Sequence, residues 1–336
     1  MFLVDRDDDT YVPGQLREVL FQKVCNGNIQ GIGNSEVMDI EHSRGYRHPK
    51  CHFVHHWNPF LIIGPFHIEV KFYEPFRTII HEFFAEKEMD WIMEYSGPRL
   101  TKSREEKISQ AALQIKKSKL GYKSGVTEGC QFWFNDIEYP DKEKYTQISS
   151  EGQPLVYDVS PAVKDPYKYI VNHKMAYSVS KRIELATHFN VTARHAATPF
   201  RTTNYGLSGI FSPHLDSWGY EKGAPITEDR KELIRTGDYM ATFQGYYKDT
   251  LGGGATGFMN KNYEGTVGPK KGSAAFWINL YSCHEKEQRS IHAGCPVLKW
   301  SKWIISRWMF SWDQWKSWPC YLEPMTTILP FSGMSV

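Results

Sequence analysis

The sequence lacks three features that would each point to a class of protein. Its 336 residues carry 40 basic and 38 acidic side chains, so the net charge of +2 gives no electrostatic reason to expect a nucleic-acid or membrane-surface partner. No apolar run approaches the roughly 20 residues that span a bilayer, so no membrane span is predicted. The six cysteines include no C-x-x-C pair, which argues against a zinc ribbon and against a thioredoxin-type site.

The sequence also carries little information about its compartment. The start, MFLVDRDDDT, lacks the basic and then apolar layout of a secretory signal peptide. The six cysteines leave disulfides open, and with them an oxidising compartment. The sequon Asn190-Val191-Thr192 would carry a glycan only in a secreted chain.

Aromatic residues are what the composition has in excess. Phe, Trp and Tyr make up 15% of the chain, and apolar residues make up 41%. A chain of this length and composition fits one large domain or two ordinary ones and can bury a sizeable core. A globular protein is therefore expected.

The first two thirds of the chain show helical patterns. Apolar residues recur at helical spacing over 83–98, where Gly97-Pro98 supplies the stop, and helices are also expected over 103–119 and 167–189. Residues 125–165 have little periodicity and are interpreted as a long insertion. The cluster HPKCHFVHH, 48–56, is interpreted as a solvated loop rather than a metal site, because no second ligand cluster follows.

From Thr202 onward the pattern changes to short stretches rich in β-branched and aromatic residues. Turn signals such as GGG, NKNYEG and GPKKG separate them. This spacing is typical of an all-β barrel or a double-sheet sandwich, and with the helices before it the whole chain is predicted to be α+β. The predicted strands are TTNYGLSGIFSPHLD, DYMATFQGYY, GATGFM, SAAFWINLYS and SKWIISRWMF.

Three residues of this β region suggest a metal site, and a fourth suggests a place for an anion beside it. His214 and Asp216, in SPHLDSW, are two apart on a predicted strand and would project to the same face. His292, in SIHAGCPV, is a third candidate ligand, and two histidines with one carboxylate suit non-haem Fe(II) and O₂ chemistry. Lys302 falls on the next predicted strand, where a buried ammonium requires an anionic partner such as a dicarboxylate.

Several motifs in this order resemble the catalytic domain of prolyl 4-hydroxylase α subunits of the collagen type. The motifs are NYGLSGIFSPHLD, GGGATGF, GPKKGSAAFWINL and HAGCPVLKWSKW, and the resemblance continues more weakly upstream. It implies an Fe(II)- and 2-oxoglutarate-dependent dioxygenase with a double-stranded β-helix (jelly-roll) core and flanking N-terminal helices. The implied domains are an extension over 1–58, a catalytic domain over 59–320 with its core at about 200–312, and a tail over 321–336.

The resemblance also assigns roles to individual residues. It implies that His214, Asp216 and His292 bind Fe(II), and that Lys302 holds the distal carboxylate of 2-oxoglutarate. Tyr205 and Thr256 would complete the cosubstrate pocket.

Other positions are assigned to the substrate side of the site. Trp277 matches an aromatic residue near the substrate, although a plain core tryptophan is the alternative. Three positions depart from the family pattern: Phe211 replaces a tyrosine, Tyr239 an arginine and Phe310 a histidine. These changes leave iron and 2-oxoglutarate binding intact but put the identity of the substrate in doubt.

The implied reaction is hydroxylation of peptidyl proline to 4-hydroxyproline in collagen-like or other proline-rich chains, with release of succinate and CO₂. O₂ is the oxidant, and L-ascorbate (vitamin C) is the family's reductant for oxidised iron. Two alternatives stay open: a 2-oxoglutarate dioxygenase with a different protein or small-molecule substrate, and a partner subunit with weak or no turnover.

The resemblance has implications for cysteines, partner and compartment as well. It implies disulfides between Cys295 and Cys320 and between Cys25 and Cys51. In that family the catalytic subunit pairs with protein disulfide isomerase in the lumen of the endoplasmic reticulum. Pairing of this chain is left open, and the lumen is expected on the cysteine pattern, with a processed or truncated N-terminus accounting for the missing signal peptide.

Overall fold

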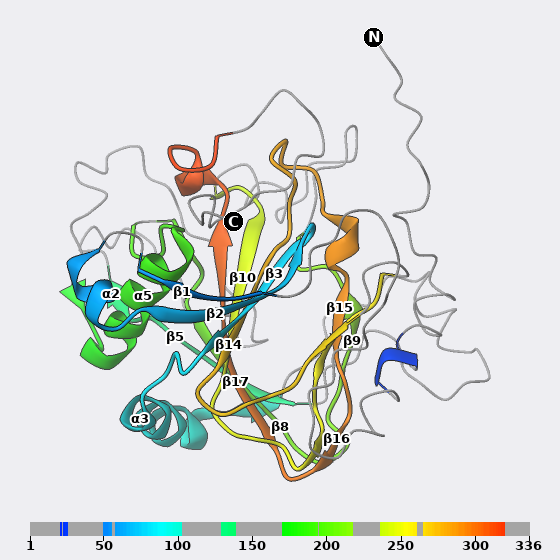
Figure 1. Cartoon of the computed structure of the whole chain (residues 1–336). Coiled ribbons are helices and arrows are strands. Elements are labelled where there is room, and N and C mark those ends of the chain that lie inside the picture. The colour runs from blue at the N-terminus through cyan, green and yellow to red at the C-terminus, as the bar shows by residue number, and fades with distance from the viewer. Residues whose placement is uncertain are drawn as a thin grey trace, which may run out of the picture.

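Two antiparallel sheets face each other in the computed structural model of the protein, and helices cover the outer side of the larger sheet (Figure 1). The structure describes residues 21, 23–25, 50–55, 58–102, 129–138, 170–193, 195–217, 236–260 and 265–319. The larger sheet has nine strands, in the spatial order β1 (Lys50–Val54), β2 (Phe66–Tyr73), β3 (Phe76–His81), β14 (Ala274–Ile278), β10 (Tyr239–Tyr246), β17 (Lys302–Phe310), β8 (Phe200–Tyr205), β5 (Cys130–Phe134) and β4 (Thr101–Lys102).

The smaller sheet has four strands and closes the other side of the barrel. Its order is β13 (Gly265–Val267), β12 (Thr256–Phe258), β15 (His292–Gly294) and β9 (Phe211–His214). Two further strand pairs are β11 (Gly252–Gly253) with β16 (Val297–Lys299), and β6 (Ile137–Glu138) with β7 (Ile170–Val171). Two facing antiparallel sheets preceded by helices confirm the predicted α+β fold with a jelly-roll core.

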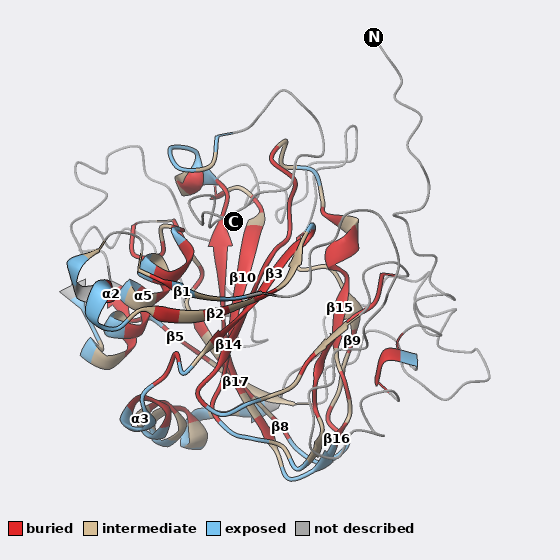
Figure 2. Cartoon of the chain, viewed as in Figure 1, coloured by how far each residue is buried: buried red, intermediate tan, exposed pale blue. Residues whose placement is uncertain are grey.

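Helices on one side make the fold three layers deep. The helices are α2 (Pro59–Ile63), α3 (Glu86–Ser96) and α5 (Lys174–Thr187), with 3₁₀ turns η2 (Gly97–Arg99), η3 (Gln288–Ser290) and η4 (Trp312–Gln314). Apolar side chains of α3 and α5, including Met89, Ile92 and Ile183, share one core with outward-facing residues of the nine-stranded sheet. Figure 2 shows the central strands β14, β10 and β17 of this sheet buried between the helices and the smaller sheet.

Alternation along β10 explains how one strand serves two layers. Ala241 and Phe243 belong to the core under the helices, whereas Tyr246 packs with residues of the smaller sheet. Thr242 and Gln244 lie on the same face as Tyr246 because strand side chains alternate with a period of two. The inner face of β10 is therefore polar although the whole strand is buried.

Most of the predicted elements occur near their predicted positions. The helix predicted over 83–98 is α3, and the one predicted over 167–189 is shorter, because β7 precedes α5. The strand predicted over 202–216 is divided by a turn into β8 and β9. The helix predicted over 103–119 lies outside the described residues, as does the tail over 321–336.

Two predictions about irregular regions were wrong. The supposed loop at 48–56 contains β1, which pairs with β2 through main-chain contacts from Lys50↔Val70 to Val54↔Phe66. The supposed insertion contains β5, whose residues pair with β8 over its whole length. In both cases a neighbouring strand satisfies the backbone groups, and the sequence of a five-residue segment does not reveal that partner.

The predicted disulfide pairings were also wrong. Cys25 is bonded to Cys295, with 5.4 Å between their Cα atoms. Cys25 packs with Phe21 and Val24 against the outer face of the smaller sheet, where Cys295 also lies, whereas Cys51 is an exposed free thiol on β1. Cys320 lies outside the described residues. The bond therefore joins the N-terminal segment to the sheet that carries the candidate metal ligands.

Candidate metal centre and adjoining pocket

The three candidate ligands come together at one end of the smaller sheet. His214 and His292 are directly paired across β9 and β15, and Asp216 follows two residues after His214. The three ligand atoms lie within 4.8 Å of one another. The Asp216 carboxylate is 3.3 Å from Nε2 of His214 and 3.6 Å from Nε2 of His292. Antiparallel pairing thus brings together two histidines that are 78 positions apart in the sequence.

Backbone carbonyls fix the protonation of both imidazoles. Nδ1 of His214 lies 2.8 Å from the Ser212 carbonyl, and Nδ1 of His292 lies 3.0 Å from the Ser290 carbonyl. A carbonyl oxygen can only accept, so each Nδ1 carries the proton and donates it. Each Nε2 is therefore the ring nitrogen that faces Asp216 and is available to a cation beside it, which is how metal-binding histidines are normally oriented.

Asp216 is held as a carboxylate. Burial alone would raise its pKa, but His292 and His214 and a hydrogen bond from Thr242 outweigh burial and hold the pKa of Asp216 below its usual range. The Thr242 hydroxyl donates to Asp216 at 2.6 Å and itself accepts from Asn279 at 2.8 Å. Burial lowers the pKa of His292 to about 4. Two imidazoles that turn Nε2 inward and one carboxylate are a suitable ligand set for a divalent metal.

Aromatic rings surround the ligands. Phe211 stacks on His214 with 3.9 Å between ring centroids, and Trp277 contacts His292 edge-on at 4.8 Å. Phe258 contacts both Trp277 and His292. His214 is the ligand most open to solvent, with 23% of its side chain exposed, against 6% for His292. The rings exclude water from most of the site and leave one side open.

A buried lysine lies at the other end of the pocket. Lys302 is 2% exposed, begins β17 and pairs with Tyr205 at the end of β8. Its ammonium lies 3.4 Å from the Thr256 hydroxyl and within 5.8 Å of the ring centroids of Tyr205 and Tyr246. Among the described residues no carboxylate lies within ion-pair distance, and burial lowers its pKa to about 7. An ammonium in such a place suits an anionic ligand.

The neighbours of Lys302 form a hydrogen-bonded network. The Gln244 amide donates to the Thr256 hydroxyl at 2.7 Å and to the Tyr246 hydroxyl at 3.0 Å, and these hydroxyls lie 3.0 Å apart. Sequence reasoning identified Thr256 but missed Gln244, Tyr246 and Thr242. Their period-two spacing on a strand otherwise made of apolar residues was a signal that could have found them.

The pocket brings together nearly all the predicted site residues. Its walls include His214, Asp216, His292, Lys302, Tyr205, Thr256, Trp277 and Phe211, and also the unpredicted Arg201, Thr242, Gln244, Ile304 and Trp308. Tyr239 is one ring further out, 5.7 Å from Trp308 and 5.3 Å from Phe310 between centroids. The free volume of about 20 Å³ suits about one water molecule, so a larger ligand requires lining side chains to move aside.

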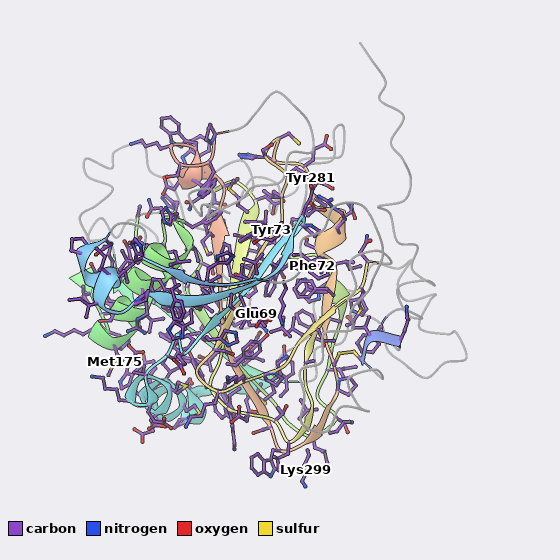
Figure 3. The ribbon with its side chains drawn as sticks, in the orientation of Figure 1. Glu69, Phe72, Tyr73, Met175, Tyr281 and Lys299 are labelled. Atoms are coloured by element: carbon purple, nitrogen blue, oxygen red, sulfur yellow. A yellow bond between two sulfur atoms is a disulfide. The ribbon has the colours of Figure 1, made fainter. Side chains whose placement is uncertain are left out.

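The pocket has a defined direction within the barrel. The metal ligands lie near η3, at the end where Figure 3 labels Tyr281, whereas Lys302 follows Lys299, labelled at the opposite end. A ligand held by both would therefore lie along the barrel axis.

Among the described residues, no helix is long and apolar enough to cross a membrane.

Comparisons with known proteins place these features in context. No protein-family model matches the chain. It is 26% identical over 277 residues to human prolyl 4-hydroxylase subunit alpha-3, which is 82% of this chain and 41% of that protein. It is 35% identical over 147 residues to bovine prolyl 4-hydroxylase subunit alpha-1, which is 44% of this chain and 26% of that protein. The chain thus spans less than half the length of these curated relatives.

Solved structures include a viral collagen prolyl hydroxylase from Paramecium bursaria chlorella virus 1 in complex with 2-oxoglutarate. It is 16% identical to this chain and covers 70% of this chain and 95% of its own, with a TM-score of 0.42. A prolyl 4-hydroxylase from Pseudomonas putida is 11% identical, with a TM-score of 0.37. The sequence comparisons confirm the resemblance to prolyl 4-hydroxylase α subunits.

Proposed function

We propose that the protein is a dioxygenase that uses Fe(II) and 2-oxoglutarate to hydroxylate peptidyl proline to 4-hydroxyproline in collagen-like or proline-rich chains, releasing succinate and CO₂. One observation carries the proposal: a triad suited to a divalent metal shares a pocket with a buried ammonium that has no carboxylate partner among the described residues. A dicarboxylate that chelates the metal fits that arrangement. The relatives named as prolyl 4-hydroxylase subunits support the choice of proline.

The residues of the chain divide the work between the two ends of the pocket. His214, Asp216 and His292 would hold the iron through two Nε2 atoms and one carboxylate oxygen. Lys302, with Thr256 and Tyr205, would bind the distal carboxylate of 2-oxoglutarate through charge-assisted hydrogen bonds. When bound, iron and 2-oxoglutarate supply the oxidative decarboxylation that lets O₂ oxidise an unactivated C–H bond.

Residues near the metal would control water and orientation. Thr242 fixes one oxygen of Asp216, so the other stays free to face a cation. The rings of Phe211 and Trp277 cover the imidazoles and keep the site dry, which protects a reactive centre from side reactions. Phe211, Trp277 and Tyr239 would line the path of the peptide substrate.

Other features of the proposal come from the resemblance. We infer that the activity belongs to residues 59–320, that L-ascorbate restores oxidised iron and that O₂ is the oxidant. The endoplasmic reticulum lumen fits the disulfide between Cys25 and Cys295, since such bonds persist in oxidising compartments. Protein disulfide isomerase is the partner to test first.

A coupled assay tests the proposal. Purified protein with Fe(II), 2-oxoglutarate and ascorbate is assayed for succinate with and without (Pro-Pro-Gly) peptides, and the peptides are analysed by mass spectrometry for hydroxyproline. Succinate release that requires peptide, together with hydroxylated proline, is the expected result. Succinate release without any effect of peptide would indicate a different substrate, and no release with any peptide would indicate a subunit without turnover.

A further inference from the structure

An arginine that the proposed reaction does not use lies in the wall of the same pocket. Arg201 is on β8, directly paired with Ser306 of β17 and with Trp133 of β5. Its guanidinium carbon lies 4.3 Å from the ring centroid of Trp308 and 5.6 Å from that of Trp133. Arg201 and Trp308 line the pocket together with His214 and Asp216. Two indoles therefore hold a planar cation beside the metal ligands.

Arg201 differs from the other arginines of the described chain in its hydrogen bonding. Its Nε is buried without a hydrogen-bond partner among the described residues, as are those of Arg77 and Arg307, but Arg77 and Arg307 donate through their other nitrogens, whereas Arg201 forms no side-chain hydrogen bond or ion pair within the described residues. The other arginines donate to carboxylates or to main-chain carbonyls: Arg77 to Arg289, Arg99 to Tyr95, Arg182 to Glu88, Arg289 to Glu287 and Arg307 to Asp136. A buried donor without an acceptor is costly, so an acceptor from outside the chain would stabilise it.

The position of Arg201 separates it from the cosubstrate end of the pocket. Lys302 pairs with Tyr205 at the end of β8, whereas Arg201 lies four residues earlier on the same strand, where it lines the pocket with His214 and Asp216 and interacts electrostatically with Asp216. At about 3.3 Å per residue, four residues correspond to roughly 13 Å. Each end of the pocket therefore has its own cation.

A count of formal charges shows that Arg201 would have no counter-charge in a site loaded with iron and 2-oxoglutarate. Ferrous iron brings two positive charges and Lys302 one, while Asp216 and the 2-oxoglutarate dianion together bring three negative charges. The loaded site would then be neutral without Arg201, which stays protonated at any physiological pH. Arg201 leaves one positive charge uncompensated in a largely buried pocket, where uncompensated charge is expensive.

We propose that Arg201 forms a carboxylate-binding subsite on the substrate side of the metal, and that the preferred substrate carries a carboxylate next to the proline that reacts. This inference rests on the proposed function and narrows its substrate class. The rigid fork of a guanidinium matches a carboxylate through two parallel hydrogen bonds, and the two indoles already hold the guanidinium plane. An acidic side chain and a free C-terminal carboxylate are the two sources of this group in a peptide.

Binding of three end-defined peptides to the protein loaded with Fe(II) and 2-oxoglutarate, under anaerobic conditions, tests the subsite without turnover. The first probe is a (Pro-Pro-Gly) peptide with both ends blocked. The second is the same peptide with one glutamate before and one glutamate after a single proline. The third is a short peptide that ends in proline with a free C-terminal carboxylate. Affinities come from calorimetry and from quenching of tryptophan fluorescence. At least one carboxylate probe is expected to bind roughly tenfold to hundredfold more tightly than the neutral peptide.

Variants show whether Arg201 causes that preference. Arg201→Gln is expected to remove the preference while leaving the affinity for the neutral peptide within about threefold, and Arg201→Lys to keep part of it. The matched control is Arg99→Gln, which removes an exposed arginine that also lies over an aromatic ring, 4.5 Å from that of Tyr95. Thermal melting checks that each variant is folded. A peptide with glutamine in place of glutamate removes the carboxylate from the ligand, and so tests the preference for a carboxylate on the unmodified protein.

The possible outcomes separate this inference from the proposed function. Equal binding of all three probes to the unmodified protein, or equal loss of affinity for every probe in Arg201→Gln, would overturn the subsite. If neutral peptides are still hydroxylated in that case, the proposed function stands without it. If no peptide is hydroxylated but carboxylate probes bind through Arg201, the subsite stands and proline is the wrong substrate.

Discussion

Strand β17 carries two cations that are equally buried but held in different ways. Lys302 and Arg307 are each 2% exposed and lie on opposite faces of the strand. Arg307 faces the helices, forms an ion pair with Asp136 at 3.0 Å, donates to Ser180 at 2.6 Å and lies 4.3 Å from the ring centroid of Phe200. Lys302 faces the pocket, where the Thr256 hydroxyl is its hydrogen-bond partner among the described residues.

The difference separates a structural cation from one to which we assign a ligand-binding role. Ser180 donates in turn to Asp136 at 2.5 Å, so the charge of Arg307 is paired within the protein and the cluster joins α5 to the sheet. The Lys302 ammonium is removed from water without a compensating charge from the part of the chain that the structure describes, which costs stability until an anion binds. A buried cation therefore indicates function when its partner is absent from the fold, and stability when its partner is present.

Removing the partner of Arg307 tests the structural half of this comparison. Asp136→Ala is expected to lower the free energy of unfolding by about 3 to 5 kcal/mol, because it leaves an uncompensated charge in the core. Denaturant unfolding measures the change. The control is Asp90→Ala, an exposed acidic residue of α3, which should change stability by less than about 0.5 kcal/mol. A loss in Asp136→Ala no larger than in the control would contradict a structural role for the pair.

Removing Lys302 should have the opposite effect on the fold. Lys302→Met is expected to leave the unliganded protein as stable as before or more stable, because it removes a buried charge that lacks a partner. Its affinity for 2-oxoglutarate should fall at least about a hundredfold, with iron affinity unchanged, since one partner of a buried charge pair is lost. Thermal melting with and without 2-oxoglutarate measures both effects, and the exposed Lys299→Met is the control. Unfolding of Lys302→Met would show that Lys302, like Arg307, stabilises the fold. Unchanged 2-oxoglutarate binding would contradict a role for Lys302 in binding that ligand.

The ionisation of Lys302 should make both stability and 2-oxoglutarate affinity depend on pH, with smaller changes than the two substitutions above. Its pKa of about 7 in the folded chain lies below the value of 10.5 for an exposed lysine, so the unfolded chain binds more protons between these values. Stability of the free protein should therefore rise with pH across that window. Binding of a dianion above pH 7 must take up a proton, so 2-oxoglutarate affinity should fall by at most about tenfold per pH unit.

Anaerobic calorimetry with Fe(II) between about pH 7 and 8.5 measures this dependence. Lys302→Arg is the control. Because arginine stays charged throughout, the affinity of this variant for 2-oxoglutarate should not change with pH over the same range. His292 is already neutral there, since burial lowers its pKa to about 4. A slope that persists in Lys302→Arg would assign the titration to another group.

The motifs predicted three candidate ligands that do lie together, and part of the reason is short-range geometry. The period of a strand puts His214 and Asp216 on one face, and each imidazole is oriented by a carbonyl two residues before it. The pairing partner of each residue is not local. The sequence therefore missed Arg201 and Trp308, which line the pocket from two adjacent strands, and gave the wrong partners for Cys25 and Cys295.

The amino-acid sequence by itself determined which faces of the strands are polar, where the main helix α3 begins and ends, and which residues can bind a metal. Those properties depend on neighbours a few positions away, so pattern and spacing reveal them. The tertiary structure alone decided that Lys302 has no anionic partner among the described residues whereas Arg307 has one, and that Arg201 shares a pocket with the candidate metal ligands. Such facts depend on which strands pair and how deeply they are buried, and burial turns an ordinary charge into a site that needs a ligand.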